Sequence, residues 1–175
     1  ITRIDAETDD HDFKKAYNEA KAMPAGEERT ASLNRSFEMY AEYFLDQVFL
    51  NDLDGFDADY EPEGDFLSGT NFEYFYKHMA KYMGPNPDIT KEERLKLIEE
   101  RYGKEIASQE GICDKMLNID QTSANQMASL VPYSNYCFLQ AYGGGTGAGS
   151  WPDEKVVYCC NMGDNWQGTM ESMYN

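Results

Sequence analysis

The chain has 175 residues and a formal net charge of −17, from 32 acidic and 15 basic side chains. This length fits one compact domain, and the charge opposes contact with nucleic-acid phosphates or an anionic lipid surface. No apolar run reaches the roughly 20 residues that a membrane-spanning helix needs. The sequence therefore argues against nucleic-acid binding and against a transmembrane span, and any membrane association is expected to pass through partner proteins.

The first residues bear on processing. The chain starts at Ile1 rather than Met, and residues 1–10 lack the basic start and apolar middle of a signal peptide. We therefore expect a processed protein of an organelle or another extracytoplasmic compartment.

Helical patterns dominate the chain up to Pro132. Apolar residues recur at steps of three and four, and Thr90 with Glu93 matches a capping box. Proline and glycine follow several of these segments, as expected at helix ends. The predicted helices are Asp9–Met23, Glu27–Leu50, Asn71–Met83, Thr90–Gln109 and a fifth candidate, Cys113–Val131.

The composition changes after Pro132. Tyr133–Tyr142 and Lys155–Met162 are rich in aromatic residues, Val and Cys, and a glycine-rich loop separates them, which favours a β-hairpin. We therefore predict a mainly α fold of about five helices with a small C-terminal β-hairpin or irregular unit, an α+β arrangement. Residues 1–132 would form the helical acidic region, and residues 133–175 an aromatic, Cys-containing unit packed on it within one compact domain.

Four cysteines are too few for a disulfide scaffold at this length and lack the CxxC spacing of zinc sites. A hairpin would bring Cys137 beside Cys159 or Cys160, so we predict a disulfide there. Buried free thiols are the alternative.

An acidic run extends from Asp46 to Asp65, with eight carboxylates and no basic residue. In the EF-hand register with Gly55 at the sixth position, Leu50 occupies the first ligand position, so that calcium motif fails. The run is interpreted as a solvated acidic loop, with a weak, irregular calcium site as the alternative, and no metal is assigned. A carboxylate pair for glycoside hydrolysis cannot be singled out, because 32 acidic residues supply pairs at any spacing.

His78 is the candidate cofactor ligand. It lies in the aromatic third helix, where it could bind a haem or chlorophyll axially, although a packed structural histidine is the simpler interpretation. A Cys and His dyad would need a thiol beside an imidazole in space, and the sequence does not identify one. No cofactor is assigned.

Aromatic residues and Met are abundant, with 13 Tyr, nine Phe, nine Met and two Trp. These types are enriched at the centres of protein interfaces, whereas desolvating charge is costly. Residues 1–65 carry 18 acidic and six basic side chains, while residues 121–152 carry none. The predicted interface residues are therefore Tyr133, Tyr136, Phe138, Tyr142, Trp151, Trp166 and Tyr174.

Together these features favour a non-catalytic linker or accessory subunit that bridges other chains of a large assembly, such as a photosynthetic or respiratory membrane complex, with a pigment as a candidate ligand. One alternative is a secreted or luminal enzyme with a carboxylate or Cys/His site. Another is an acidic decoy whose helices imitate nucleic-acid phosphates. The partner itself is not identified by the sequence.

Overall fold

The computed structural model describes residues 11–61, 66–142, 147–159, 167–168 and 170–171. Its centre is a four-stranded sheet in which every neighbouring pair is parallel, with the strand order β1-β2-β3-β4. The fold is therefore α/β. The strands are β1 (Gly55–Tyr60), β2 (Met116–Gln121), β3 (Cys137–Gln140) and β4 (Val156–Cys159).

Helices connect the strands, as parallel pairing requires. The connection from β1 to β2 contains two α-helices and one 3-10 helix, and the first two α-helices precede β1. The α-helices are α1 (Asp12–Ala22), α2 (Glu27–Leu50), α3 (Thr70–Met79) and α4 (Lys91–Ala107), and the 3-10 helices are η1 (Ile112–Asp114), η2 (Ala128–Tyr133) and η3 (Asp153–Lys155).

The first four predicted helices are confirmed, and the second has the predicted bounds. The capping box is also present, since the Thr90 side chain accepts a hydrogen bond from the Glu93 amide and the Glu93 carboxylate accepts one from the Thr90 amide. The capping residues and the apolar periodicity of the sequence were therefore sufficient to predict these four helices.

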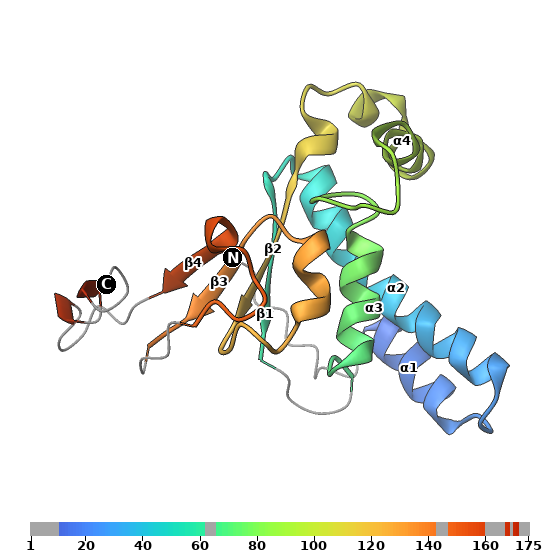
Figure 1. Ribbon diagram of the computed structural model, residues 1–175. Coiled ribbons are helices and arrows are strands. Elements are labelled where there is room, and N and C mark those ends of the chain that lie inside the picture. The colour runs from blue at the N-terminus through green and yellow to red at the C-terminus, as the bar shows by residue number, and fades with distance from the viewer. Residues whose placement is uncertain (1–10, 62–65, 143–146, 160–166, 169, 172–175) are drawn as a thin grey trace.

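One face of the sheet packs against the helices. Figure 1 shows α1, α2 and α3 on the same side of the sheet. In the ladder register, Ala58 lies opposite Ile119 and Ile119 opposite Cys137, so these three buried residues share a face. Tyr60, Gln121 and Leu139 follow on the same face and are also buried. This packed face, with the aromatic side chains of α2 and α3, is the hydrophobic core.

The alternate residues of the strands point to the opposite face, which we call the open face because no described helix covers it. Its side chains come from all four strands, and several of them are exposed. The residues on the open face are Asp57, Asp59, Met116, Asn118, Asp120, Phe138, Gln140, Val157 and Cys159.

The predicted fold class was wrong. The fifth helix candidate, Cys113–Val131, contains β2, whose burial alternates from Met116 to Gln121 with a period of two rather than 3.6. The predicted hairpin is absent, because β3 and β4 pair in parallel and therefore cannot be joined by a tight turn. The sheet joins β2, from the predicted helical region, to β3 and β4 beyond Pro132.

The register of β3 and β4 also decides one disulfide prediction. Cys137 lies opposite Val156, whereas Cys159 lies opposite Gln140, three positions further along. At about 3.3 Å per residue this offset alone exceeds the roughly 7 Å Cα separation that a disulfide tolerates. Cys137 is a buried thiol, so a Cys137 to Cys159 bond is ruled out; Cys160 lies outside the described residues.

None of the described helices combines the length and apolar composition needed to cross a bilayer.

Candidate functional site

Carboxylates gather where the first two strands end. Asp57 and Asp59 alternate along β1, and Asp59 lies directly opposite Asp120 of β2 in the ladder. The same alternation, continued one residue past β1, places the exposed Glu61 on the open face as well. Since ligands of open parallel sheets bind beyond the carboxyl ends of the strands, this is the candidate site of the molecule.

The carboxyl groups influence one another. Partial burial, and then the charges of Asp120 and Asp59, raise the pKa of Asp57 to about 6 although its side chain reaches solvent. Burial also raises the pKa of Asp120, and the charges of Asp59 and Glu61 raise it further. The cluster therefore keeps a proton up to a higher pH than an isolated aspartate does. Because its members are coupled, that proton belongs to the group rather than to one residue.

Two residues that follow on β3 complete the cluster. The Gln140 amide donates a hydrogen bond to Asp59 Oδ1 over 3.2 Å, and its interaction with Asp120 lowers the pKa of that carboxyl group, opposing the effect of burial. Tyr142, just beyond β3, has a side chain that is 54% exposed. Slight burial raises its pKa, with further contributions from the charges of Asp120, Asp59 and Glu61, so its phenol lies within electrostatic range of them.

Two oxygens of the open face have unmet hydrogen-bonding capacity. Asn118 Oδ1 and Asp120 Oδ1 are both inaccessible to solvent and have no hydrogen-bond partner among the described residues. Buried polar atoms are normally paired, so such atoms beside a carboxylate cluster are positions where a bound molecule or water can contribute a donor.

The acidic run was therefore misinterpreted in its central part. It was expected to be a solvated loop, but its first residues, 46–50, belong to α2 and Gly55–Tyr60 forms β1. Of the described residues of the run, only 51–54 and Glu61 lie outside a helix or strand. The signal in the sequence was the period-two spacing of Asp57, Asp59 and Glu61 between Phe56, Ala58 and Tyr60. Within the described part of the chain, no three His, Cys, Asp or Glu side chains are placed to hold a metal ion together.

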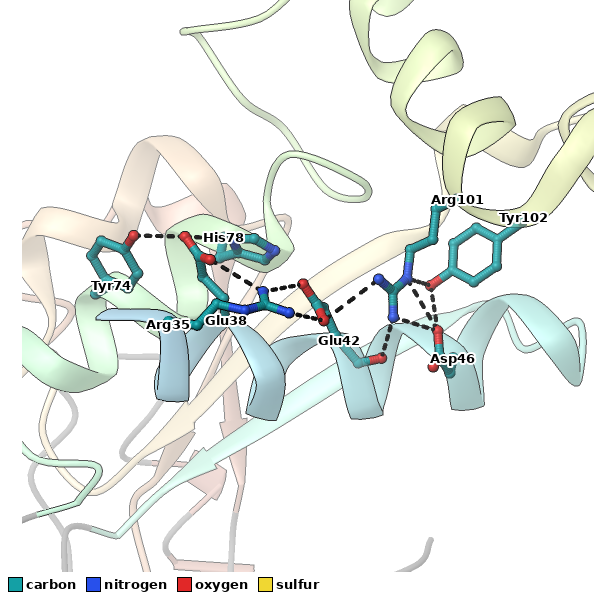
Figure 2. A network of polar contacts seen from close by, with 8 residues as sticks. All are labelled: Arg35, Glu38, Glu42, Asp46, Tyr74, His78, Arg101 and Tyr102. Atoms are coloured by element: carbon teal, nitrogen blue, oxygen red, sulfur yellow. Dashed lines mark hydrogen bonds and ion pairs between the residues drawn. The ribbon is translucent and has the colours of Figure 1, made fainter. Parts of the chain in front are cut away.

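A second polar cluster lies on the other side of the sheet, where α2 faces α3 and α4 (Figure 2). Arg35 pairs with Glu42 at 2.7 Å, and Arg101 of α4 donates to Asp46 at 2.9 and 3.1 Å. Tyr74 of α3 donates to Glu38 over 2.8 Å. These contacts tie α3 and α4 to α2, so the cluster has a structural role that accounts for its charges.

His78 lies at one end of this second cluster, with a side chain that is only 10% exposed. Its Nδ1 is 3.8 Å from Glu38 Oε1, and neither ring nitrogen has a hydrogen-bond partner among the described residues. Burial is the main cause that lowers its pKa to about 4. The helical, buried position agrees with a packed histidine, and a cofactor at His78 stays a prediction.

The predicted interface residues occupy different surroundings. Tyr136, which is 40% exposed, and Phe138 share the open face, and Tyr142 adjoins the carboxylates. Tyr133 is half-buried in η2 and donates a hydrogen bond to Asp88, while Trp151 is 3% exposed in the core. Trp166 and Tyr174 lie outside the described residues. The structure thus brings together three of the seven, beside the carboxylate site.

Comparison with known proteins gives one structural similarity. No family model matches the chain, and no curated protein matches it. The crystal structure of an endo-beta-N-acetylglucosaminidase from Cordyceps militaris in apo form is similar with a TM-score of 0.48 and 18% sequence identity. The match covers 76% of this chain and 42% of the fungal chain, so this chain spans less than half of that enzyme.

The similar structure is that of an enzyme, and the expectation of a protein without catalytic activity is withdrawn. At this level of similarity, the substrate and the activity of the fungal enzyme do not extend to this chain.

Proposed function

We propose that the carboxylate cluster at the end of β1 and β2 catalyses acid–base hydrolysis of glycosidic bonds. The observation that carries the proposal is the convergence of Asp57, Asp59, Glu61 and Asp120 on the open face, where burial and the neighbouring charges raise the pKa of Asp57 and of Asp120. Glycoside hydrolysis needs both a carboxylic acid and a carboxylate beside the scissile bond. A cluster of coupled carboxyl groups can supply both forms at the same pH.

The positions of the residues suggest their roles. Glu61 lies furthest towards the edge where a ligand approaches, so the proton shared by the coupled carboxyl groups would pass through Glu61 to the glycosidic oxygen. The bond between that oxygen and the anomeric carbon then breaks, and its electron pair stays with the oxygen. The positive charge left on the sugar lies beside Asp59. Water adds to the anomeric carbon and returns a proton to Glu61, which restores the acid.

The surroundings favour this class over a thiol enzyme. Cys113 and Cys137 are buried, and Cys159 is half-buried on the open face, whereas His78 lies on α3, on the packed side of the sheet, so the sheet separates that thiol from this imidazole. The carboxylate version of the enzyme hypothesis is thus the better supported one. The exposed ring of Tyr142 beside the cluster offers an aromatic surface and a hydroxyl group to a sugar.

The test is a hydrolysis assay of the 175-residue chain on a panel of glycosides that includes N-acetylglucosamine-containing glycans, a choice prompted by the name of the fungal enzyme. Glu61→Gln should lower kcat about 100-fold or more, as expected for loss of a general acid. Asp54→Asn is the matched control, because Asp54 belongs to the same acidic run but precedes β1, at the opposite end of the strand.

Wild-type activity in Glu61→Gln would refute the assigned role. Absence of glycoside hydrolysis across the panel, with a correctly folded chain, would refute the proposed function.

A further inference from the structure

Two side chains of α3 lie beside the same carboxylate oxygen of α2. Tyr74 and His78 are four residues apart, so they share one face of α3 at a spacing of one helical turn. The Tyr74 hydroxyl donates to Glu38 Oε1 over 2.8 Å, and His78 Nδ1 is 3.8 Å from the same atom. Figure 2 shows both side chains next to the Glu38 carboxylate. Glu38 Oε1 therefore has one donor in place and a ring nitrogen close by.

His78 is the member of this pair that can gain a charge. Its side chain is buried, and neither ring nitrogen has a hydrogen-bond partner among the described residues. A neutral imidazole has one donor nitrogen, whereas the imidazolium ion has two donors and a positive charge. Protonation would turn this unpaired ring into a donor that needs an acceptor, and Glu38 Oε1 already lies within ion-pair distance.

Glu38 can accept from either donor because it is held as a carboxylate. Burial opposes its ionisation, but the hydrogen bonds from Tyr74 and Arg35 and the charge of His78 outweigh burial and lower the pKa of Glu38. Arg35 Nη1 donates to the other oxygen, Oε2, over 3.2 Å. An exchange of donors at Oε1 therefore leaves the bond from Arg35 in place.

We infer that His78 and Glu38 form a proton-dependent switch between α2 and α3. While His78 is neutral, Tyr74 donates to Glu38 Oε1. When His78 takes up a proton, its Nδ1–H donates to Glu38 Oε1 instead, and the Tyr74 hydroxyl is released. Because the two donors are one turn apart on α3, the exchange keeps α3 attached to α2 but changes the side chain that makes the attachment. The inference goes beyond the proposed function and does not depend on it.

The groups around His78 set the pH at which the switch operates. The charged and titratable groups that face it are Arg35, Glu38 and Glu42 of α2, and Lys81 and Tyr82, which follow α3. Burial and the two cations oppose protonation, the two carboxylates favour it, and burial prevails, so the pKa of His78 is lowered to about 4. Burial also raises the pKa of Tyr82, which is therefore neutral in acid. The switch is expected to operate near pH 4.

The test is an NMR titration of the 175-residue chain labelled with carbon-13 in histidine and tyrosine, with the signals assigned from His78→Phe and Tyr74→Phe. In the wild type, the Tyr74 ring signal should move with the same midpoint as the His78 signal, and this transition should be absent from the Tyr74 signal in His78→Phe. Tyr74→Phe removes the competing donor, so the His78 midpoint should rise by about half a pH unit or more. Tyr136→Phe, which removes an exposed phenol hydroxyl on the open face, is the matched control and should leave the His78 midpoint unchanged.

Glu38→Gln is an independent check, because loss of the carboxylate charge should lower the His78 midpoint. A His78 midpoint that is the same in wild type and in folded Tyr74→Phe overturns the inference, since the two donors then do not compete for Glu38. Circular dichroism at each pH shows whether the chain is folded, and unfolding of the wild type before His78 titrates also overturns the inference. If Tyr74→Phe itself is unfolded, the wild-type Tyr74 signal decides, because a switch requires that it move at the His78 midpoint. Each of these results is the same whether or not the chain hydrolyses glycosides.

Discussion

Acidification should destabilise the protein through His78. Burial lowers the pKa of this imidazole to about 4 in the folded chain, whereas an unfolded histidine titrates near 6.5. Between these two values His78 binds more protons in the unfolded state than in the folded state, so its contribution to folding stability falls as the pH falls. The stabilising contribution is complete above pH 6.5 and is lost progressively down to about pH 4. From pH 7 to pH 5, linkage gives a loss of about 2 kcal/mol from this one group.

Urea unfolding at pH 7, 6 and 5 measures the effect. The variant His78→Phe keeps a ring at this buried position but cannot titrate, so its free energy of unfolding should fall about 2 kcal/mol less than that of the wild type between pH 7 and pH 5. His11→Gln, which removes the other histidine of the chain, is the control and should follow the wild type. If the free energies of unfolding of the wild type and of His78→Phe change with pH in the same way, the pKa of His78 is not lowered in the folded state and the prediction is wrong.

Two further predictions concern stability. The hydrogen bonds from Arg101 to Asp46 should show a coupling free energy of about 1 kcal/mol in a double-mutant cycle with Arg101→Met and Asp46→Asn. The value is small because Asp46 is 40% exposed and solvent screens the pair. A coupling free energy of zero would mean that the contact does not stabilise the packing of α4 on α2. Gly84→Ala should lower the free energy of unfolding by about 2 kcal/mol or more, because Gly84 has a φ of +66° and an added Cβ would lie 2.6 Å from Leu117 Cβ. A melting temperature unchanged from that of the wild type would contradict this prediction.

The helices were predictable because their signals are local. In α2, apolar residues recur along one side, and α4 begins with a complete capping box. Each signal lies within a few residues of the element it specifies, so no knowledge of the tertiary structure was needed. The predicted third helix extended beyond Met79, where the chain continues in turns.

The strands were harder to predict because their partners lie far apart in the sequence. Gly55–Tyr60 pairs with Met116–Gln121, and nothing local in either segment reports that pairing. A parallel sheet also needs long connections, so the short spacing between β3 and β4 suggested an antiparallel hairpin instead. The predicted role as a linker subunit of a larger assembly is untouched by these contacts and stays a prediction, as do the compartment and the partner.

The candidate site was overlooked for a physical reason. A strand is ordinarily recognised by apolar residues on its buried face and tolerant polar residues on the other, but β1 places carboxylates at consecutive outward positions. Carboxylates two residues apart on one face of a strand repel each other and destabilise it, so the composition of this segment indicated a loop. The strand forms because Ala58 and Tyr60 are buried against the helices and because β2 supplies a full ladder of partners. Where local preference is overruled in this way, the residues responsible are expected to serve function rather than folding. The acidic side chains of β1 meet that description. Substitution of these side chains should therefore lower activity with little loss of stability, whereas substitution of core residues should lower stability first.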